Sequence, residues 1–306
     1  MSTGPSFCIL PQRGVLVVGG EERHSFLQGL ISNSIAPVAA GGVVHAALLT
    51  PQGKFLHEFF VVAWGEQVVL EAEAERRADL HARLAYFRLR AKVTLAVAEA
   101  EDRVVAVVFG LGAAEALAVA AQAAQQVRPL AEGVAYRDPR LAEAGVRLIG
   151  SRSCLEETLS AAGCREAAPQ AYDRWRLTLG LPDGSRDMVV ERSGILECGF
   201  EELNGVDFNK GCYVGQEVIT RSKYRGVLKK RLMPVAIDGP VPDPGTPLWL
   251  EEREAGEMRS AVEGIGLAVL WLDALAEAQR TARPIHTGST RLTPRPPEWM
   301  ILPSGP

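Results

Sequence analysis

The chain has 306 residues, a hydrophobic fraction of 47%, a charged fraction of 23% and a formal net charge of −4. These values are ordinary for a globular protein, and the acidic excess argues against a surface basic enough to coat nucleic acid. No stretch approaches the ~20 apolar residues of a membrane span, and residues 1–11 lack the features of an export or organelle-targeting segment. We therefore expect a cytoplasmic protein of about two domains, with no membrane partner.

The first part of the chain mixes helices with strands that often follow one another directly. Pro51-Gln52-Gly53-Lys54 suits a hairpin turn between two of these strands, since proline presets φ and glycine tolerates a positive φ. Adjacent strands argue against a simple doubly wound sheet and favour an α+β fold. The expected strands are 13–20, 43–49, 55–64, 92–98, 103–109 and 146–149, and the expected helices are one from Glu21, then 74–88, 113–126, 153–162 and 170–179.

The pattern changes at about Val227. Helical periodicity disappears, prolines and glycines punctuate the chain, and short strands such as 232–237 and 261–270 dominate. This composition predicts a separate, smaller domain with a β-barrel-like fold. We expect one region over residues 1–226 and a C-terminal barrel domain over residues 227–306.

The cysteines do not form a disulfide framework, because they are widely spaced along a long chain. None forms the C-x₂-C pair typical of zinc or iron–sulfur ligands, and the histidines include no pair at helical spacing. We therefore predict no resident metal. The five cysteines are Cys8, Cys154, Cys164, Cys198 and Cys212.

Cys212 lies between Gly211 and Gly215, so the backbone there can turn tightly and leave the sulfur accessible. Residues 215–220 look like the opening of a helix, and a thiol just before a helix N-terminus is favoured as a thiolate. Lys210 would act in the same direction. The alternative is an inert cysteine buried in a glycine-containing turn.

The basic run within residues 218–237 and the carboxylate of Glu197 each allow more than one interpretation. Residues 218–237 contain no acidic side chain, so their basic run could bind an anion such as a folate glutamate tail, a phosphate or RNA, or could form a solvated strand face. Glu197 lies in an apolar context and could accept hydrogen bonds from a pterin or cap a helix near Phe200. The basic residues are Arg221, Lys223, Arg225, Lys229, Lys230 and Arg231.

The octapeptide Lys210–Glu217, KGCYVGQE, resembles the signature of YgfZ-type proteins, the bacterial relatives of mitochondrial iron–sulfur assembly factors. Residues 205–208 before the octapeptide and 224–226 after it also resemble this family. Segments across most of the chain are also similar to this family: 13–16, 26–30, 49–54, 86–92 and 172–182. The wider superfamily is that of the glycine-cleavage aminomethyltransferase. The resemblance implies a three-lobed ring around a folate-binding channel, with the chain crossing between two lobes in residues 1–226.

The resemblance also implies tetrahydrofolate, or a derivative, as the cofactor. Glu197 matches the position that grips the pterin, and Glu58 is near the position of a carboxylate that orients the folate. We add residues of the basic segment to this cofactor site and assign the chemistry to Cys212 with Lys210. The added residues are Arg221, Tyr224 and Arg225.

Two differences from the aminomethyltransferase sequence pattern argue against methylene transfer. His57-Glu58 replaces the aspartate pair of the transferases, and Asn33-Ser34 replaces their Asn-Asp dipeptide. The resemblance therefore implies an accessory protein for assembly or repair of 4Fe–4S clusters, acting through a reactive Cys212, with tRNA-thiolating radical enzymes among its clients. A folate-dependent aminomethyltransferase or one-carbon transferase is the alternative, and direct RNA binding is not expected.

Overall fold

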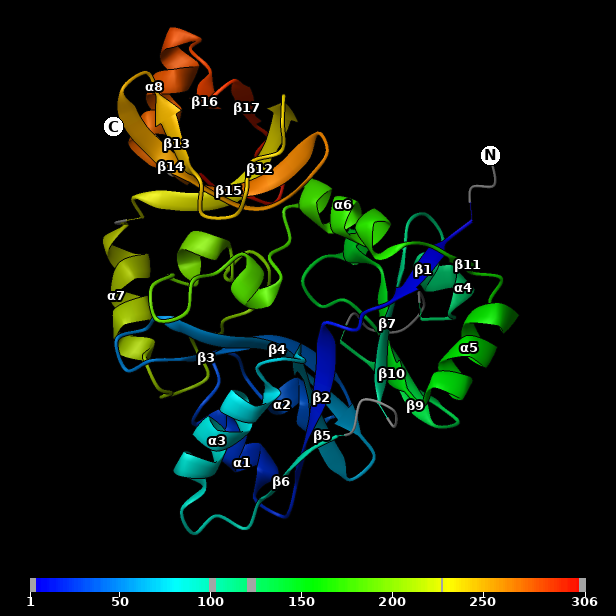
Figure 1. Cartoon of the computed structure of the whole chain (residues 1–306). Coiled ribbons are helices and arrows are strands. Elements are labelled where there is room, and N and C mark those ends of the chain that lie inside the picture. The colour runs from blue at the N-terminus through cyan, green and yellow to red at the C-terminus, as the bar shows by residue number, and fades with distance from the viewer. Residues whose placement is uncertain (1–3, 99–102, 120–124, 227, 303–306) are drawn as a thin grey trace.

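The structure of the chain, a computed structural model, describes residues 4–98, 103–119, 125–226 and 228–302. Two lobes are built on open sheets and a third is a closed barrel (Figure 1). The expected α+β architecture with a C-terminal barrel is therefore confirmed. Among the described residues, no helix is both long enough and apolar enough to cross a membrane.

The first lobe is an antiparallel five-stranded sheet in the order β3-β4-β5-β2-β6. The expected hairpin is confirmed, because β3 and β4 pair on either side of a turn in which Gly53 has a φ of 72°. The strands are β2 (Arg13–Gly19), β3 (Val43–Leu49), β4 (Phe55–Trp64), β5 (Gln67–Glu73) and β6 (Thr94–Val97). The helices are α1 (Arg23–Gln28), α2 (Ala36–Ala39) and α3 (Arg77–Arg88).

The second lobe is a six-stranded sheet in the order β11-β1-β7-β10-β9-β8. Its strand β1 comes directly before β2 in the chain, so the chain crosses between the two sheets at its start. The strands are β1 (Ser6–Ile9), β7 (Val104–Phe109), β8 (Val127–Leu130), β9 (Gly133–Arg137), β10 (Val146–Gly150) and β11 (Arg165–Glu166). The helices are η1 (Ala142–Ala144), α4 (Ala113–Ala116) and α5 (Arg152–Ala161).

The alanine-rich helix expected over 113–126 is wrong in its length. Among the described residues of this stretch, only α4 is helical, and Ala118 follows it with a φ of 50°, which a continuing helix cannot accommodate. Part of the expected helix, residues 120–124, lies outside the described residues. Helix propensity alone therefore overestimated this element.

The third lobe is a barrel closed in the order β12-β15-β14-β13-β16-β17. The single strand expected over 261–270 is two strands, because Gly264 turns the chain with a φ of 80° and Val262 then pairs with Ile265. The domain boundary at 226/227 stays a prediction, since residue 227 lies outside the described residues. The strands are β12 (Lys230–Asp238), β13 (Pro247–Leu250), β14 (Arg253–Val262), β15 (Ile265–Trp271), β16 (Ile285–Thr287) and β17 (Thr290–Pro294).

The expectation that helical periodicity ends at Val227 is also wrong, because α8 (Leu272–Thr281) lies within the barrel lobe. Its buried residues Ala274, Leu275 and Ala278 recur at helical spacing and belong to the same apolar core as the barrel strands. The small alanine side chains made this stripe weak in the sequence.

Two helices and the long segment between them connect the lobes: α6 (Pro169–Leu179), η2 (Gly184–Arg186), η3 (Leu196–Cys198) and α7 (Gln216–Arg225). Helix α6 packs on β14 and β15. The buried Arg231 of β12 donates to the Leu196 carbonyl at 2.9 Å and to Glu202 at 2.7 Å. These bonds fix the barrel to the connecting segment.

A network of buried charges joins the first two lobes. Glu71 of β5 is fully buried and accepts hydrogen bonds from Arg13 at 3.1 Å, from Tyr136 at 2.5 Å and from Arg147. Arg13 also pairs with Glu58 at 2.9 Å. Burial alone raises the pKa of Glu71, but Arg147 and Arg13 outweigh burial and hold this pKa below its ordinary value. Glu71 is therefore charged and compensated from both sheets.

Replacing Glu71 with glutamine should leave Arg13 and Arg147 buried without their shared carboxylate. Breaking a buried ion pair by removing one partner costs about 3–5 kcal/mol, and we expect a loss of that order in the free energy of unfolding measured with urea. Glu156→Gln is the control, because Glu156 pairs with Arg152 at 3.7 Å on the exposed face of α5 and should change stability by less than about 1 kcal/mol. Equal losses in the two variants would contradict the role given to Glu71.

Candidate functional site

The octapeptide and the β3–β4 turn contact each other through two glycines. Gly215 has a φ of 85°, and a Cβ placed on it would lie 2.6 Å from the Thr50 carbonyl oxygen. A Cβ placed on Gly53 would lie 3.2 Å from the Gly215 carbonyl oxygen. Two backbones can approach this closely only where neither residue has a side chain. The same contact therefore explains the glycine of the turn, Gly53, and the glycine of the octapeptide, Gly215.

Lys210 and Gln28 anchor the octapeptide loop to the first lobe. The Lys210 ammonium donates to the carbonyls of Gln28 and Ile31, at 2.6 Å each, and the Gln28 amide donates to the Lys210 carbonyl at 2.8 Å. Burial lowers the pKa of Lys210 to about 8. The side chain thus holds the loop in place, and its predicted effect on the thiol stays a prediction.

Cys212 lies within this anchored loop and is exposed. The next residue, Tyr213, is buried in the core beneath it and fixes the loop from inside. Gly215 is the N-cap of α7, so the thiol precedes the helix by a short turn and does not occupy its first position. The structure therefore excludes the alternative of a buried, inaccessible Cys212.

The other cysteines, all in the described part of the chain, are less accessible. Cys8, Cys154 and Cys198 are buried, and Cys164 is partly buried. Burial raises the pKa of Cys8 and of Cys198 to about 12, so both remain protonated thiols near neutral pH. Cys212 is the only exposed thiol among the five.

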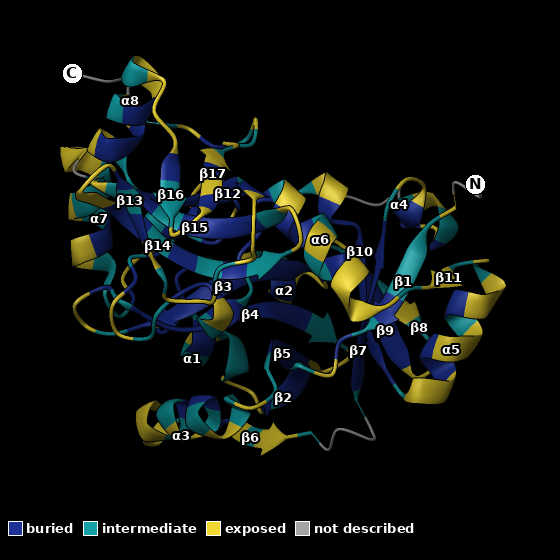
Figure 2. Ribbon diagram, turned by 45° about the horizontal axis from the view of Figure 1, so that its top comes forward, coloured by how far each residue is buried: buried dark blue, intermediate teal, exposed yellow. Residues whose placement is uncertain are grey.

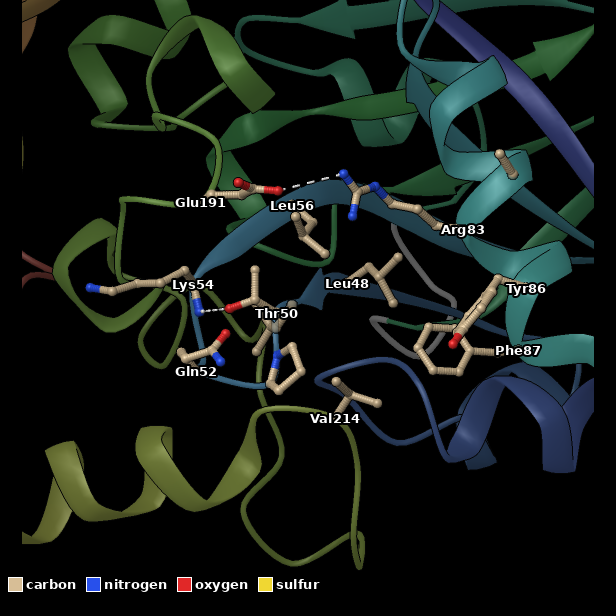
Figure 3. A pocket seen from close by; sticks show the side chains of 13 residues that line it. Leu48, Thr50, Gln52, Lys54, Leu56, Arg83, Tyr86, Phe87, Glu191 and Val214 are labelled. Carbon is tan, nitrogen blue, oxygen red and sulfur yellow. Dashed lines mark hydrogen bonds and ion pairs between the residues drawn. The ribbon is translucent and has the colours of Figure 1, made fainter.

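A groove of about 830 Å³ lies between the β3–β4 hairpin, α3 and the octapeptide, which contributes Val214 (Figure 3). We call it the α3 groove. Aliphatic side chains such as Leu48 and Leu56 form much of its wall, and Tyr86 and Phe87 of α3 stand at one side with their rings 5.4 Å apart, edge to face. Segments 49–54 and 86–92 were predicted only to resemble a family, and no pattern in them indicated that they would form a groove.

Arg83 is the basic side chain that α3 contributes to the groove, and it is held from two sides. Its Nε donates to Asp79 at 2.9 Å, and Glu191 lies 3.7 Å from its guanidinium. Asp79 is also 2.8 Å from Nε2 of His57, whose pKa is lowered to about 4 by burial and by Arg76. A neutral His57 with its proton on Nε2 therefore fixes Asp79, and Asp79 fixes Arg83.

Glu58, expected to orient folate, lies in the buried junction of the lobes. It alternates with His57 along β4, so it faces the opposite side of the sheet from the α3 groove. Its carboxylate is 2.9 Å from Arg13 and 3.2 Å from Nε2 of His45. Only about 10 Å³ of cavity remains at this junction, which is less than a single water molecule requires in most cavities.

The remaining residues assigned to folate are dispersed. Glu197 accepts a hydrogen bond from the Gly194 amide at 3.2 Å and lies 3.8 Å from Lys230. Arg221, Tyr224 and Arg225 are exposed on α7, where Arg221 pairs with Glu217 at 2.6 Å. None of these residues lines the α3 groove. The five assigned residues do not surround one cavity, so they do not fit a folate as a set.

Metal binding has no obvious location in the parts of the chain that the structure describes. No group of at least three His, Cys, Asp or Glu side chains is placed there to hold an ion. A single thiol such as Cys212 supplies one ligand to a metal, and further ligands would have to come from another molecule.

Comparison with known proteins identifies the family. Human iron–sulfur cluster assembly factor IBA57, mitochondrial, is 31% identical over 315 aligned positions, which cover 95% of this chain and 84% of the human protein. This chain belongs to the IBA57 family of iron–sulfur cluster assembly factors. The Neurospora crassa homologue is 30% identical over 76% of this chain. The match covers only 54% of the length of the Neurospora crassa protein.

The barrel and the overall fold have their own counterparts. The model of the CAF17 C-terminal beta-barrel domain matches residues 229–301. The crystal structure of glycine cleavage system aminomethyltransferase T from Bartonella henselae matches with a TM-score of 0.73, at 16% identity, over 96% of this chain and 85% of that chain. The expected aminomethyltransferase-like fold is thus confirmed.

One expectation is overturned. The sequence predicted a cytoplasmic protein, whereas the similar IBA57 proteins of human, Neurospora crassa, Phaeosphaeria nodorum and Mycosarcoma maydis are all named as mitochondrial. The composition of the first eleven residues was too weak a basis for assigning a compartment. The same relatives are named as iron–sulfur cluster assembly factors.

The contact between Gly215 and the hairpin can be tested with two alanine variants. Gly211→Ala and Gly215→Ala both place a side chain at positive φ, at a cost of about 1–2 kcal/mol. Gly211 has nothing within 4 Å of an added Cβ, whereas Gly215 meets Thr50. We expect a clearly larger loss of unfolding free energy for Gly215→Ala, and equal losses would contradict the backbone contact.

The lowered pKa of Lys210 predicts a pH dependence. Between about pH 8 and the ordinary value of 10.5, the unfolded chain still binds a proton that the folded chain has released, so this group makes stability rise with pH. Lys210→Gln lacks that proton. From about pH 8 to about pH 10.5, the unfolding free energy of the wild type should therefore rise relative to that of Lys210→Gln. A difference that does not change with pH would contradict a lowered pKa at this part-buried ammonium.

Proposed function

We propose that this protein is a YgfZ-type accessory factor that assists the assembly or repair of 4Fe–4S clusters in client proteins through Cys212. The observation that carries the proposal is the exposure of this one thiol in a loop that is otherwise rigidly anchored. Membership of the IBA57 family supports the link to cluster assembly. The YgfZ resemblance extends the clients to radical enzymes that thiolate tRNA.

The rigid surroundings of Cys212 suit a thiol that meets a large partner. Tyr213 and Lys210 fix the backbone on both sides, so the sulfur is presented at a constant position. A thiolate is the form that binds iron or attacks sulfur. Since Cys212 supplies one ligand, the client or a cluster carrier must hold the rest of the cluster during the contact.

Tetrahydrofolate is a separate proposal, and no step of this mechanism passes through it. The residues assigned to it do not surround one cavity, and Glu197 is used locally by Gly194 and Lys230. A titration with tetrahydrofolate should give the same affinity for the wild type and Glu197→Ala. The alternative of an aminomethyltransferase draws support from the fold alone.

The role of Cys212 can be measured in cells that lack their own protein of this family. Cys212→Ser should abolish recovery of a 4Fe–4S dehydratase, both in activity and in visible cluster absorbance, because serine removes the sulfur ligand while preserving size. Cys164→Ser is the matched control, since this partly buried thiol has a pKa raised by burial. Full recovery with Cys212→Ser would refute the proposed function.

A further inference from the structure

We propose that the α3 groove is the docking site for a segment of the client protein that combines apolar and acidic side chains. The inference rests on the proposed function, because its purpose is to bring the client to the loop that carries Cys212. Val214 connects the two features: it lines the groove and lies two residues after Cys212. The inference concerns a binding surface and is separate from the chemistry of the thiol.

The interior of the groove is suited to apolar side chains. Leu48 and Leu56 come from the two strands of the hairpin, and Val214 comes from the octapeptide loop. A concave surface of several hundred Å³ with mainly apolar walls is typical of a binding site. The groove is built from elements that are fixed by strand pairing and by the Gly53–Gly215 contact, so it exists before any partner binds.

Exposed apolar side chains extend the groove along the end of α3. Tyr86 is 78% exposed, Leu89 is 88% exposed and Phe87 is 39% exposed. Leu89 has a φ of 45°, which ends the helix and leaves its side chain outside the core. Figure 2 shows the outer side of α3 and the neighbouring β6 as exposed. Single exposed apolar residues are common, but a group beside an apolar groove marks an interaction surface.

The charge at the end of α3, beside the groove, favours an acidic partner, and the groove lining itself carries Lys54 and Arg83 against a single carboxylate, Glu191. Residues 80–98 contain no acidic side chain, and Arg88 and Arg90 at the end of α3 are exposed. Lys92 already pairs with Glu21, and Arg83 already pairs with Asp79. Arg88 and Arg90 are therefore the basic groups at this end of α3 that we expect to pair with a carboxylate of the client. The chain as a whole has a net charge of −4, which makes this surface distinct. Complementary charge steers association and fixes its register.

The apolar walls favour a protein segment over RNA. Phosphates could pair with Arg88 and Arg90, and a base could stack on Tyr86, but Leu48, Leu56 and Val214 offer nothing to a polyanion. A peptide with alternating apolar and acidic side chains satisfies the groove and its basic rim together. RNA is therefore the competing outcome of the test.

Fluorescence anisotropy with three probes tests this inference on the full chain. The probes are short labelled peptides with a Leu-Phe-Leu centre flanked by glutamates or by lysines, and a single-stranded RNA oligonucleotide. The glutamate peptide should bind at least about tenfold more tightly than the lysine peptide, and added salt should weaken it. Equal binding of both peptides, or tighter binding of the RNA, would overturn the inference.

Matched variants locate the binding. Tyr86→Ser should weaken the glutamate peptide by about tenfold, as expected for an aromatic anchor. Leu111→Ser is the control, because Leu111 is 81% exposed between β7 and α4 in the second lobe and is remote from the groove. Both side chains are exposed, so neither change should unfold the chain. Equal affinity in both variants would place the binding elsewhere and refute the docking site.

The same variants separate this inference from the proposed function. Cys212→Ser should bind the glutamate peptide normally yet fail to restore the client dehydratase, whereas Tyr86→Ser should lose affinity and restore the dehydratase poorly. If Tyr86→Ser restores it fully, the docking site is refuted and the role of Cys212 stands. If Cys212→Ser restores it, the proposed function fails regardless of peptide binding.

Discussion

The carboxylate of Glu71 is the constraint on which the arrangement of the lobes depends. It lies in one sheet and accepts hydrogen bonds from Tyr136 and Arg147 of the other, as well as from Arg13 of its own. A charge removed from water is tolerated only when it is paired and hydrogen-bonded. Separating the lobes would leave several charges uncompensated at once, so these bonds oppose separation of the first two lobes.

The same charges fill the junction of the first two lobes. Arg13 and Glu58 meet there and leave about 10 Å³ of cavity. The exposed Cys212 loop and the α3 groove lie at the surface. The fold resembles that of an aminomethyltransferase, and Cys212 is exposed on its surface.

Local features of the fold could be predicted from the sequence, but the partners of its buried charges could not. The turn at Gly53 followed from proline and glycine chemistry. Glu71 and Arg147 interrupt apolar strands, which signals buried charge, but they are 76 positions apart and nothing in either strand identifies the other. The glycine neighbours made Cys212 one possible reactive thiol, and the octapeptide resemblance singled it out. The helix over 74–88 was predicted, but only the tertiary structure shows that Tyr86 and Phe87 at its end are exposed.

The direct contact between Gly53 and Gly215 has a consequence for protein engineering. The octapeptide cannot be transferred to another protein on its own. Its backbone packs directly against a hairpin more than 150 positions earlier in the chain, and Gln28 donates a hydrogen bond to its Lys210 carbonyl. Grafting the octapeptide loop onto another scaffold would also require the β3–β4 turn at Gly53 and the hydrogen bond from Gln28. A substitution in either glycine would also be tolerated only alongside a compensating change in the other segment, so the two should vary as a linked pair over evolution.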